Sequence, residues 1–224
     1  MAGEDNTFLK LEFSVSDEFG KMVETTDEEE AKKAGIHNPK ARYGSSIAIM
    51  SDPRLVKGFK DALAAAKDGV ATTASIKKGD AFGERREELV VLLPMKKFEE
   101  ANLHPQVGMV IDLDGSQGRV QSISGGRVRV DMNHELAGKD IIYKFKILER
   151  ISEPEKKINA IIEEQLGLLS AAKVIGELAT ISIPQDAMGK DEYLHGKYGA
   201  IQAALQFIPE IKKIEWTEEF VRSA

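Results

Sequence analysis

Residues 55–63 read Leu-Val-Lys-Gly-Phe-Lys-Asp-Ala-Leu, and apolar side chains recur in this stretch at the spacing of an α-helix. The apolar positions are Leu55, Val56, Phe59, Ala62 and Leu63. Residues at this spacing are most often core residues, so we expect this face to pack against other elements. Asp68 and Gly69 end the helical pattern.

Short strand patterns precede and follow this helix. Residues 9–15 alternate apolar and polar side chains, as a half-buried strand does. Further strand candidates are residues 21–25, 47–50, 70–76 and 90–93. Residues 27–34 carry acidic side chains first and basic side chains last, and Gly35 follows them. This order suits the helix dipole and predicts a short exposed helix.

From residue 107 onward, short strand patterns are separated by glycine. The strand candidates are residues 107–113, 118–124, 127–132 and 141–148. Asp114-Gly115 and Gly125-Gly126 are strong hairpin turns between them. The first 150 residues are therefore predicted to be mainly β.

The last seventy or so residues follow a different pattern. Ser152 and Pro154 open an amphipathic helix that is predicted from Glu153 to about Gly176. A strand at 179–183, a helix at 194–207 and a strand at 212–216 follow. This order predicts a small α/β module. Its two short strands would gain from pairing across a two-fold axis.

The composition excludes several classes of protein. The 224 residues include 31 Lys+Arg and 37 Asp+Glu, for a net charge of −6, and no cysteine. Disulfides, thiol catalysis and Cys-ligated metals are excluded, and the acidic balance argues against a nucleic-acid partner. No apolar run approaches the roughly 20 residues of a membrane helix, and the first residues do not resemble a signal peptide. We expect a soluble, cytoplasmic protein without a membrane partner.

Conventional catalytic motifs are absent from the sequence. The four histidines, His37, His104, His134 and His195, are scattered without the spacing of metal ligands. There is no phosphate-binding loop and no Gly-x-Ser-x-Gly motif. We therefore expect neither a metal nor a cofactor.

Three stretches resemble the FKBP-type peptidyl-prolyl cis/trans isomerases. Residues 11–13 with 19–26 are similar to the opening hairpin of that family. Residues 55–63 are similar to its Val-Ile-x-Gly-aromatic-x-x-Ala-Leu helix, and Ala81-Phe82-Gly83-Glu84 to its Ala-Tyr-Gly-Glu loop. The resemblance covers about residues 8–150.

Further stretches narrow the resemblance to a subfamily. Residues 105–109, 125–128 and 130–139 resemble the insert-in-the-flap domain of SlyD-like members, and Asn-His-x-Leu-Ala-Gly at 133–138 is the most specific string. With its C-terminal extension, the chain resembles an archaeal long-type FKBP. The implied fold is α+β: an antiparallel sheet wrapped on a short helix, an inserted small β domain and a C-terminal α/β domain. The implied domains are residues 1–88 with 139–152 for the isomerase, 89–138 for an insert-in-flap chaperone domain, and 153–224 for a C-terminal α/β domain. Archaeal long-type relatives use this last region to dimerise, so the resemblance predicts a homodimer.

The resemblance implies catalysis of rotation about Xaa–Pro bonds in unfolded or nascent polypeptides, together with chaperone (holdase) activity. Rotation destroys C–N resonance and meets a barrier of about 20 kcal/mol. Water bonded to the carbonyl oxygen favours the charge-separated resonance form, so an apolar pocket lowers this barrier without any nucleophile or metal.

The resemblance also assigns site residues. They are Phe13, Val23, Glu24, Leu55, Val56, Phe59, Phe82 and Tyr143. Phe59 would form the pocket floor, Val56 would offer its backbone N–H to a substrate carbonyl, and Tyr143 would contact the prolyl carbonyl region. Glu24 stands where the family has Asp.

Some positions depart from the family pattern. Val23 replaces a large Phe, Phe82 lacks the family's Tyr hydroxyl, and Ser46 replaces an apolar pocket residue. Each change removes wall area or a hydrogen bond worth about 1 kcal/mol, so weak activity is expected. The alternative interpretation is a chaperone or peptide-binding module whose isomerase site is weak or inactive.

Overall fold

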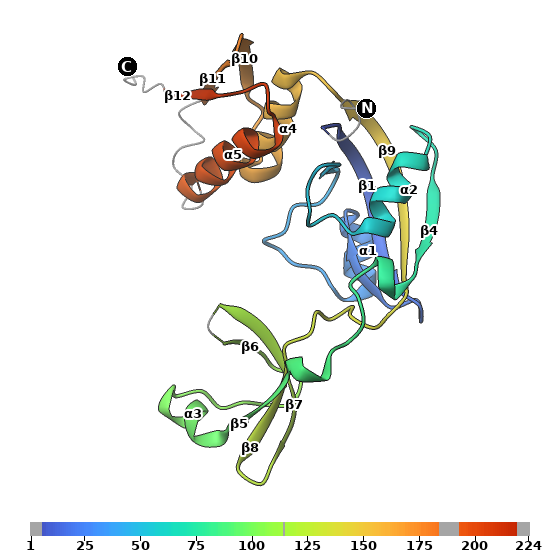
Figure 1. Cartoon of the computed structure of the whole chain (residues 1–224), viewed down its shortest axis with the longest axis vertical. Coiled ribbons are helices and arrows are strands. Elements are labelled where there is room, and N and C mark those ends of the chain that lie inside the picture. The colour runs from blue at the N-terminus through green and yellow to red at the C-terminus, as the bar shows by residue number, and fades with distance from the viewer. Residues whose placement is uncertain (1–5, 114, 184–192, 219–224) are drawn as a thin grey trace. The chain divides into compact units, whose positions relative to one another are not determined.

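The computed structural model describes residues 6–113, 115–183 and 193–218 (Figure 1). The chain divides into two compact units. Unit 1 comprises Met1–Ser75 with Ile142–Ala224, and unit 2 comprises Ile76–Ile141. Among the described residues, no helix has the length and apolar character needed to cross a membrane.

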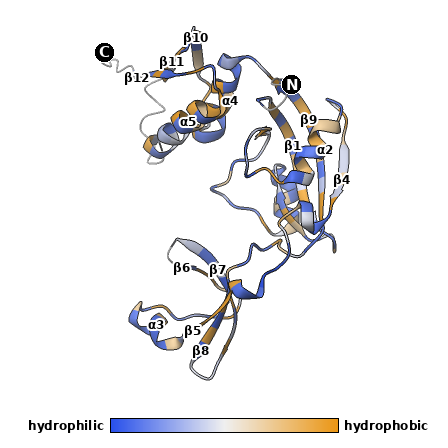
Figure 2. Cartoon of the chain, viewed as in Figure 1, coloured by the Kyte–Doolittle hydropathy of each residue, from blue (hydrophilic) through white to orange (hydrophobic). Residues whose placement is uncertain are grey.

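Unit 1 is built on a five-stranded sheet. Its strands are β1 (Phe8–Asp17), β2 (Met22–Thr25), β3 (Ser46–Ile49), β4 (Thr72–Ile76) and β9 (Ile141–Ile151). The order is β2-β1-β9-β4, and β3 pairs with β1; both β2 and β3 run antiparallel to β1. Apolar and polar residues alternate along β1 and β9 (Figure 2), so one face of each strand can be buried.

Two short helices accompany this sheet. The predicted exposed helix is α1 (Glu28–Ala34), which Asp27 caps by accepting a hydrogen bond from the backbone N–H of Glu30 and which Gly35 ends in the left-handed conformation. The predicted core helix is α2 (Lys57–Ala65), which buries Phe59 and Leu63.

The C-terminal part of unit 1 corrects one prediction. Helix α4 (Pro154–Leu166) stops ten residues before Gly176, because Gly167 adopts a left-handed φ of 64° and caps it. The next residues form β10 (Ala171–Ile175), which pairs antiparallel with β11 (Leu178–Ile183). A short apolar run such as Ala171–Ile175 fits a helix or a strand, and only the hairpin partner decides between them.

Helix α5 (Tyr193–Phe207) and strand β12 (Lys213–Glu218) complete this part, and the sheet order is β10-β11-β12. Its core includes a residue from the first strand of the chain. Phe8 is fully buried in the same apolar cluster as Ile158 and Ile161 of α4, and Ile47 and Ile49 of β3 pack against that cluster. The ammonium group of Lys157 lies 5.6 Å from the centroid of the Phe8 ring. The C-terminal part therefore packs on the β1–β3 edge.

Unit 2 has a sheet of its own. Its elements are β5 (Val90–Pro94), α3 (Met95–Glu100), β6 (Val110–Leu113), β7 (Ser116–Ser124) and β8 (Arg127–Asp131). The strand order is β5-β8-β7-β6 with antiparallel pairing throughout. Helix α3, which the sequence analysis missed, buries Phe98 against Val120 and Val128. Together the two units confirm a mixed α+β fold with mainly antiparallel sheets and few helices; β11 and β12 pair in parallel.

Candidate active site

An aromatic cluster lies between α2 and the sheet of unit 1. The rings of Phe59 and Tyr143 stack with centroids 3.9 Å apart and planes at 14°. Phe145 meets Phe59 edge-on at 5.3 Å, and Phe13 lies tilted at 6.4 Å. Because strand residues two apart share a face, β9 presents Tyr143 and Phe145 together toward α2. The cluster is dry: Phe59 is 4% exposed and Tyr143 7%.

Glu24 lies near Tyr143, next to an irregularity in β2. Glu24 pairs with Val15 of β1, whereas Met22 pairs with Ser16, so Val23 is an extra, bulged residue. Glu24 as a whole is exposed, yet neighbouring protein atoms partly remove its carboxyl from water and raise its pKa. Burial, together with the charge of Glu24, raises the pKa of Tyr143 to about 12. The Tyr143 hydroxyl therefore stays protonated at neutral pH.

Leu55 and Val56 precede α2 instead of forming part of it. The backbone N–H of Leu55 donates to the carbonyl of Asp52 (3.1 Å), which closes a turn. Val56 is the N-cap residue, and its carbonyl accepts from the N–H groups of Phe59 (3.0 Å) and Lys60 (2.9 Å). Both residues are half-buried, so they present apolar side chains at the start of the helix.

Phe82 belongs to unit 2, unlike the other assigned residues. It is half-buried, and its ring stacks on the imidazole of His134 with centroids 4.1 Å apart and planes at 2°. The structure thus brings Phe13, Phe59 and Tyr143 into one cluster and places Glu24 near enough to act on Tyr143. The stack of Phe82 on His134 was not predicted, since their sequence separation gives no signal of contact.

Ser46 contacts the C-terminal part of unit 1. Its hydroxyl donates to the carboxylate of Glu164 in α4 at 2.9 Å. Burial raises the pKa of Glu164, and the hydrogen bond from Ser46 opposes this rise. The guanidinium of Arg42 donates to the carbonyls of Glu163 and Glu164 (3.0 Å to the latter), at the carboxyl end of the helix. A polar residue at position 46 therefore has a partner outside the aromatic cluster.

A hollow of about 790 Å³ in unit 1 adjoins the aromatic cluster. It is lined by Glu12–Ser14, Thr25–Glu30, Tyr43, Gly44, Ala71–Thr73 and Lys144–Lys146. This lining contains Phe13 and Phe145 but neither Phe59 nor Tyr143, and acidic residues dominate its rim. Acidic side chains beside Phe13 and Phe145 thus make this hollow partly polar, unlike the dry pocket that the resemblance implies.

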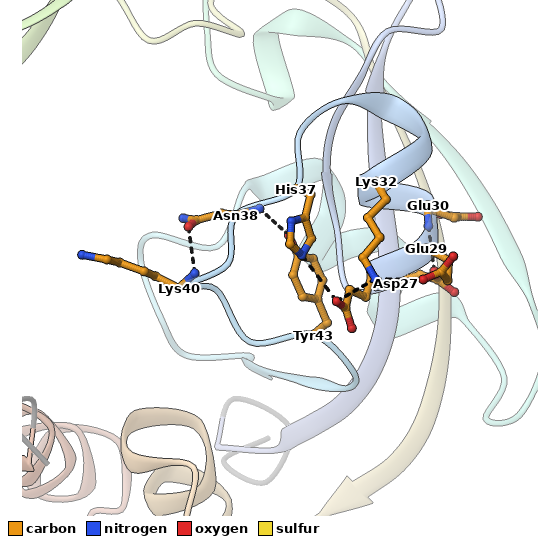
Figure 3. Close-up of polar contacts among 9 residues, drawn as sticks. Asp27, Glu29, Glu30, Lys32, His37, Asn38, Lys40 and Tyr43 are labelled. Atoms are coloured by element: carbon orange, nitrogen blue, oxygen red, sulfur yellow. Dashed lines mark hydrogen bonds and ion pairs between the residues drawn. The ribbon is translucent and has the colours of Figure 1, made fainter.

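The acidic rim is held by local polar contacts (Figure 3). Lys32 bridges the carboxylates of Glu28 (2.9 Å) and Glu29 (3.0 Å). The Nε2 atom of His37 lies 3.4 Å from Glu28, and the His37 ring stacks on Tyr43 at 5.4 Å. These contacts between residues close in sequence explain how the acidic side chains of the rim are arranged. Within the described ranges, no group of three His, Asp or Glu side chains could hold a metal ion.

Comparison with known proteins adds independent information. Residues 91–136 match the family model "FKBP26, IF domain". Over 128 residues the chain is 32% identical to the short-type peptidyl-prolyl cis-trans isomerase of Methanocaldococcus jannaschii, covering 57% of this chain and 82% of that protein. It is 30% identical over 105 residues to the FKBP-type 16 kDa peptidyl-prolyl cis-trans isomerase of Escherichia coli K12, covering 45% and 70%. The FKBP-type isomerase SlyD of Vibrio cholerae is 30% identical over 108 residues, covering 46% and 53%.

Proposed function

The chain belongs to the FKBP-type peptidyl-prolyl cis-trans isomerases, and from this premise we propose that it accelerates Xaa–Pro rotation at the aromatic cluster of unit 1. The single observation that supports this site most is the dry grouping of Phe59 with Tyr143, Phe145 and Phe13. Half-buried Leu55 and Val56 adjoin Phe59 along the chain and would extend the apolar surface.

The proposed mechanism is desolvation. A prolyl ring held against Leu55, Val56 and Phe59 would have its preceding carbonyl removed from water, which destabilises the planar, charge-separated amide relative to the twisted one. The backbone N–H of Val56 would orient the substrate, and no group would need to exchange a proton. Val23 and Glu24 would border the site. Phe82 would contact the substrate, a role that only the resemblance of its loop supports.

We propose that the chain is of the archaeal long, SlyD-like type and that residues 89–138 act as a holdase for unfolded chains. The match of residues 91–136 to an IF domain supports this assignment. Leu92 (54% exposed), Val107 (67%) and Val110 (48%) offer apolar surface on this part of the chain. Strands β5 and β6 lie at the two ends of their sheet, where an extended segment can add as a further strand. Such tethering would raise the effective substrate concentration for a weak isomerase site.

Exchange NMR on a proline-containing peptide, with and without catalytic amounts of the full chain, tests the isomerase function. Faster cis–trans exchange is expected. Deleting residues 90–130, which leaves the string at 131–138 in place, should slow catalysis of a proline-limited protein refolding reaction while leaving the activity on short peptides. An equal loss on both substrates would contradict this division of work.

We also propose a homodimer formed through residues 153–224. Leu194 (74% exposed), Tyr198 (67%) and Leu205 (41%) recur along α5 at intervals of four and seven residues, which places them on one helix face. Light scattering should give twice the monomer mass for the wild type, and the Leu194→Lys/Tyr198→Lys variant should be monomeric. A monomeric wild type would exclude the dimer.

One observation favours a second candidate function, a chaperone with an inactive isomerase site. Tyr143 covers one face of Phe59, whose side chain is almost fully buried, so little of the proposed pocket floor is open to a prolyl ring. If the site is merely impaired, Val23→Phe/Glu24→Asp should raise peptide activity. No activity before or after this change, with aggregation still suppressed, would favour the chaperone alone.

A further inference from the structure

Residues 131–138 hold the loop that carries Phe82. The Asn133 side chain accepts a hydrogen bond from the N–H of Arg86 and donates one to the carbonyl of the same residue, each at 2.9 Å. The N–H of Gly138 donates to the carbonyl of Gly83 at 2.7 Å. The backbone at Gly83 and at Arg86 is thereby fixed to residues 131–138. Gly83 directly follows Phe82 in the chain.

His134 supplies the side-chain contact within this arrangement. Its imidazole lies parallel to the Phe82 ring at 4.1 Å. Its Nδ1 atom accepts a hydrogen bond from the backbone N–H of Leu136 at 3.2 Å, which orients the imidazole ring. The Leu136 side chain is buried (4% exposed), so the backbone that orients His134 is itself anchored. The orientation of Phe82 is thus set by a ring whose own orientation is fixed.

We propose that His134 is a positioning residue of the isomerase reaction, which acts by holding the Phe82 ring in the orientation that contacts the substrate. This inference rests on the proposed function, in which Phe82 touches the substrate. Because Phe82 has no hydroxyl, it can contact a substrate only through its ring, and the direction in which that ring faces decides the contact. Stacked aromatic pairs are favoured by both area and electrostatics, so loss of the imidazole would free the ring to reorient.

The test is a double-mutant cycle on the full chain, with Phe82→Ala, His134→Ala and the double variant assayed on a proline-containing peptide. His134→Ala should raise KM about 2- to 10-fold with kcat unchanged, because a contact made equally in ground and transition states is lost. In the Phe82→Ala background the same change should have no further effect. His134→Phe should restore KM, since a phenyl ring can stack in the same place. His104→Ala is the matched control, an exposed histidine of the same unit.

The outcomes separate this inference from the proposed function. A lower apparent kcat at constant KM would mean that His134→Ala only reduces the folded fraction, and the inference would be wrong. Additive effects of His134→Ala and Phe82→Ala would also overturn it, as would an unchanged KM in an active enzyme. A wild-type chain without any isomerase activity would instead overturn the proposed function, and this inference with it.

Discussion

The rings of Phe59 and Tyr143 stack face to face, with centroids 3.9 Å apart and planes at 14°. Phe59 comes from α2 and Tyr143 from β9, so this contact joins the helix to the sheet of unit 1. A prolyl ring cannot occupy the face of Phe59 that Tyr143 covers. At the proposed site, substrate would therefore use the surface beside the stack or displace the Tyr143 ring.

Two substitutions at Tyr143 separate the contribution of its ring to stability from that of its hydroxyl group. Tyr143→Ala should lower the free energy of unfolding by about 3 kcal/mol, because it removes a buried ring. Tyr143→Phe keeps the stack and should cost no more than about 1 kcal/mol. Urea unfolding of both variants measures the difference. Equal destabilisation by the two changes would mean that the hydroxyl, and not the ring, makes the important contact.

Glu24 should make the free energy of unfolding depend on pH. Its pKa is raised by burial in the folded protein, so the folded state holds this proton more tightly than the unfolded chain. The resulting stabilisation is fully present below the ordinary value of 4.5 and is lost as the pH rises through the higher folded value. Glu24→Gln removes this dependence. Urea unfolding across that pH range should show the wild type losing stability relative to Glu24→Gln, and parallel curves would contradict the prediction.

Gly167, which caps the end of α4, lies close to the guanidinium group of Arg42. A Cβ atom at Gly167 would lie 2.6 Å from Cζ of Arg42, whereas one at Gly176 would meet nothing within 4 Å, and both residues have a φ near 60°. Gly176→Ala should cost about 1 kcal/mol from backbone strain alone. Gly167→Ala should cost more, because Arg42 must move and release the helix carbonyls that it binds.

The control for this prediction is the Arg42→Ala background. There Gly167→Ala should cost no more than Gly176→Ala, since the guanidinium is gone. Chemical denaturation of the four variants gives these differences. If the cost of Gly167→Ala is the same with and without Arg42, the contact has no energetic role.

Gly118 offers a point mutation that weakens unit 2. An added Cβ would lie 2.3 Å from Sδ of Met132 and 2.7 Å from Cγ1 of Val130. Gly118→Ala should therefore destabilise the unit 2 sheet by about 1–3 kcal/mol, as overpacking does. Ser122→Ala, at an exposed position on the same strand, is the control and should be neutral.

Hydrogen exchange measures the effect of Gly118→Ala. Amides of β7 and β8 should lose protection, whereas amides of β1 and β9 should keep theirs. On the proposed division of work, refolding of protein substrates should suffer while peptide isomerisation persists. Unchanged exchange in β7 and β8 would show that the sheet accommodates the methyl group.

Much of the fold followed from local patterns. Asp27 and Gly35 predicted both ends of α1, and the alternation of β1 and β9 follows directly from their sequence. The enzyme class, suggested by residues 55–63 and the string at 133–138, is confirmed by the relatives. The bulge at Val23 was missed, because a bulge depends on the register between two strands and not on either strand alone.

The sequence by itself determined most of the helices and strands and the family to which the chain belongs, because caps, alternation and short motifs act over a few residues. The tertiary structure alone decided that α4 gives way to β10, that Phe8 is buried against the C-terminal part of the chain, and that Phe82 stacks on His134. Each of these depends on a partner distant in sequence. Such contacts are specified by the summed packing of the whole unit, which no local pattern contains.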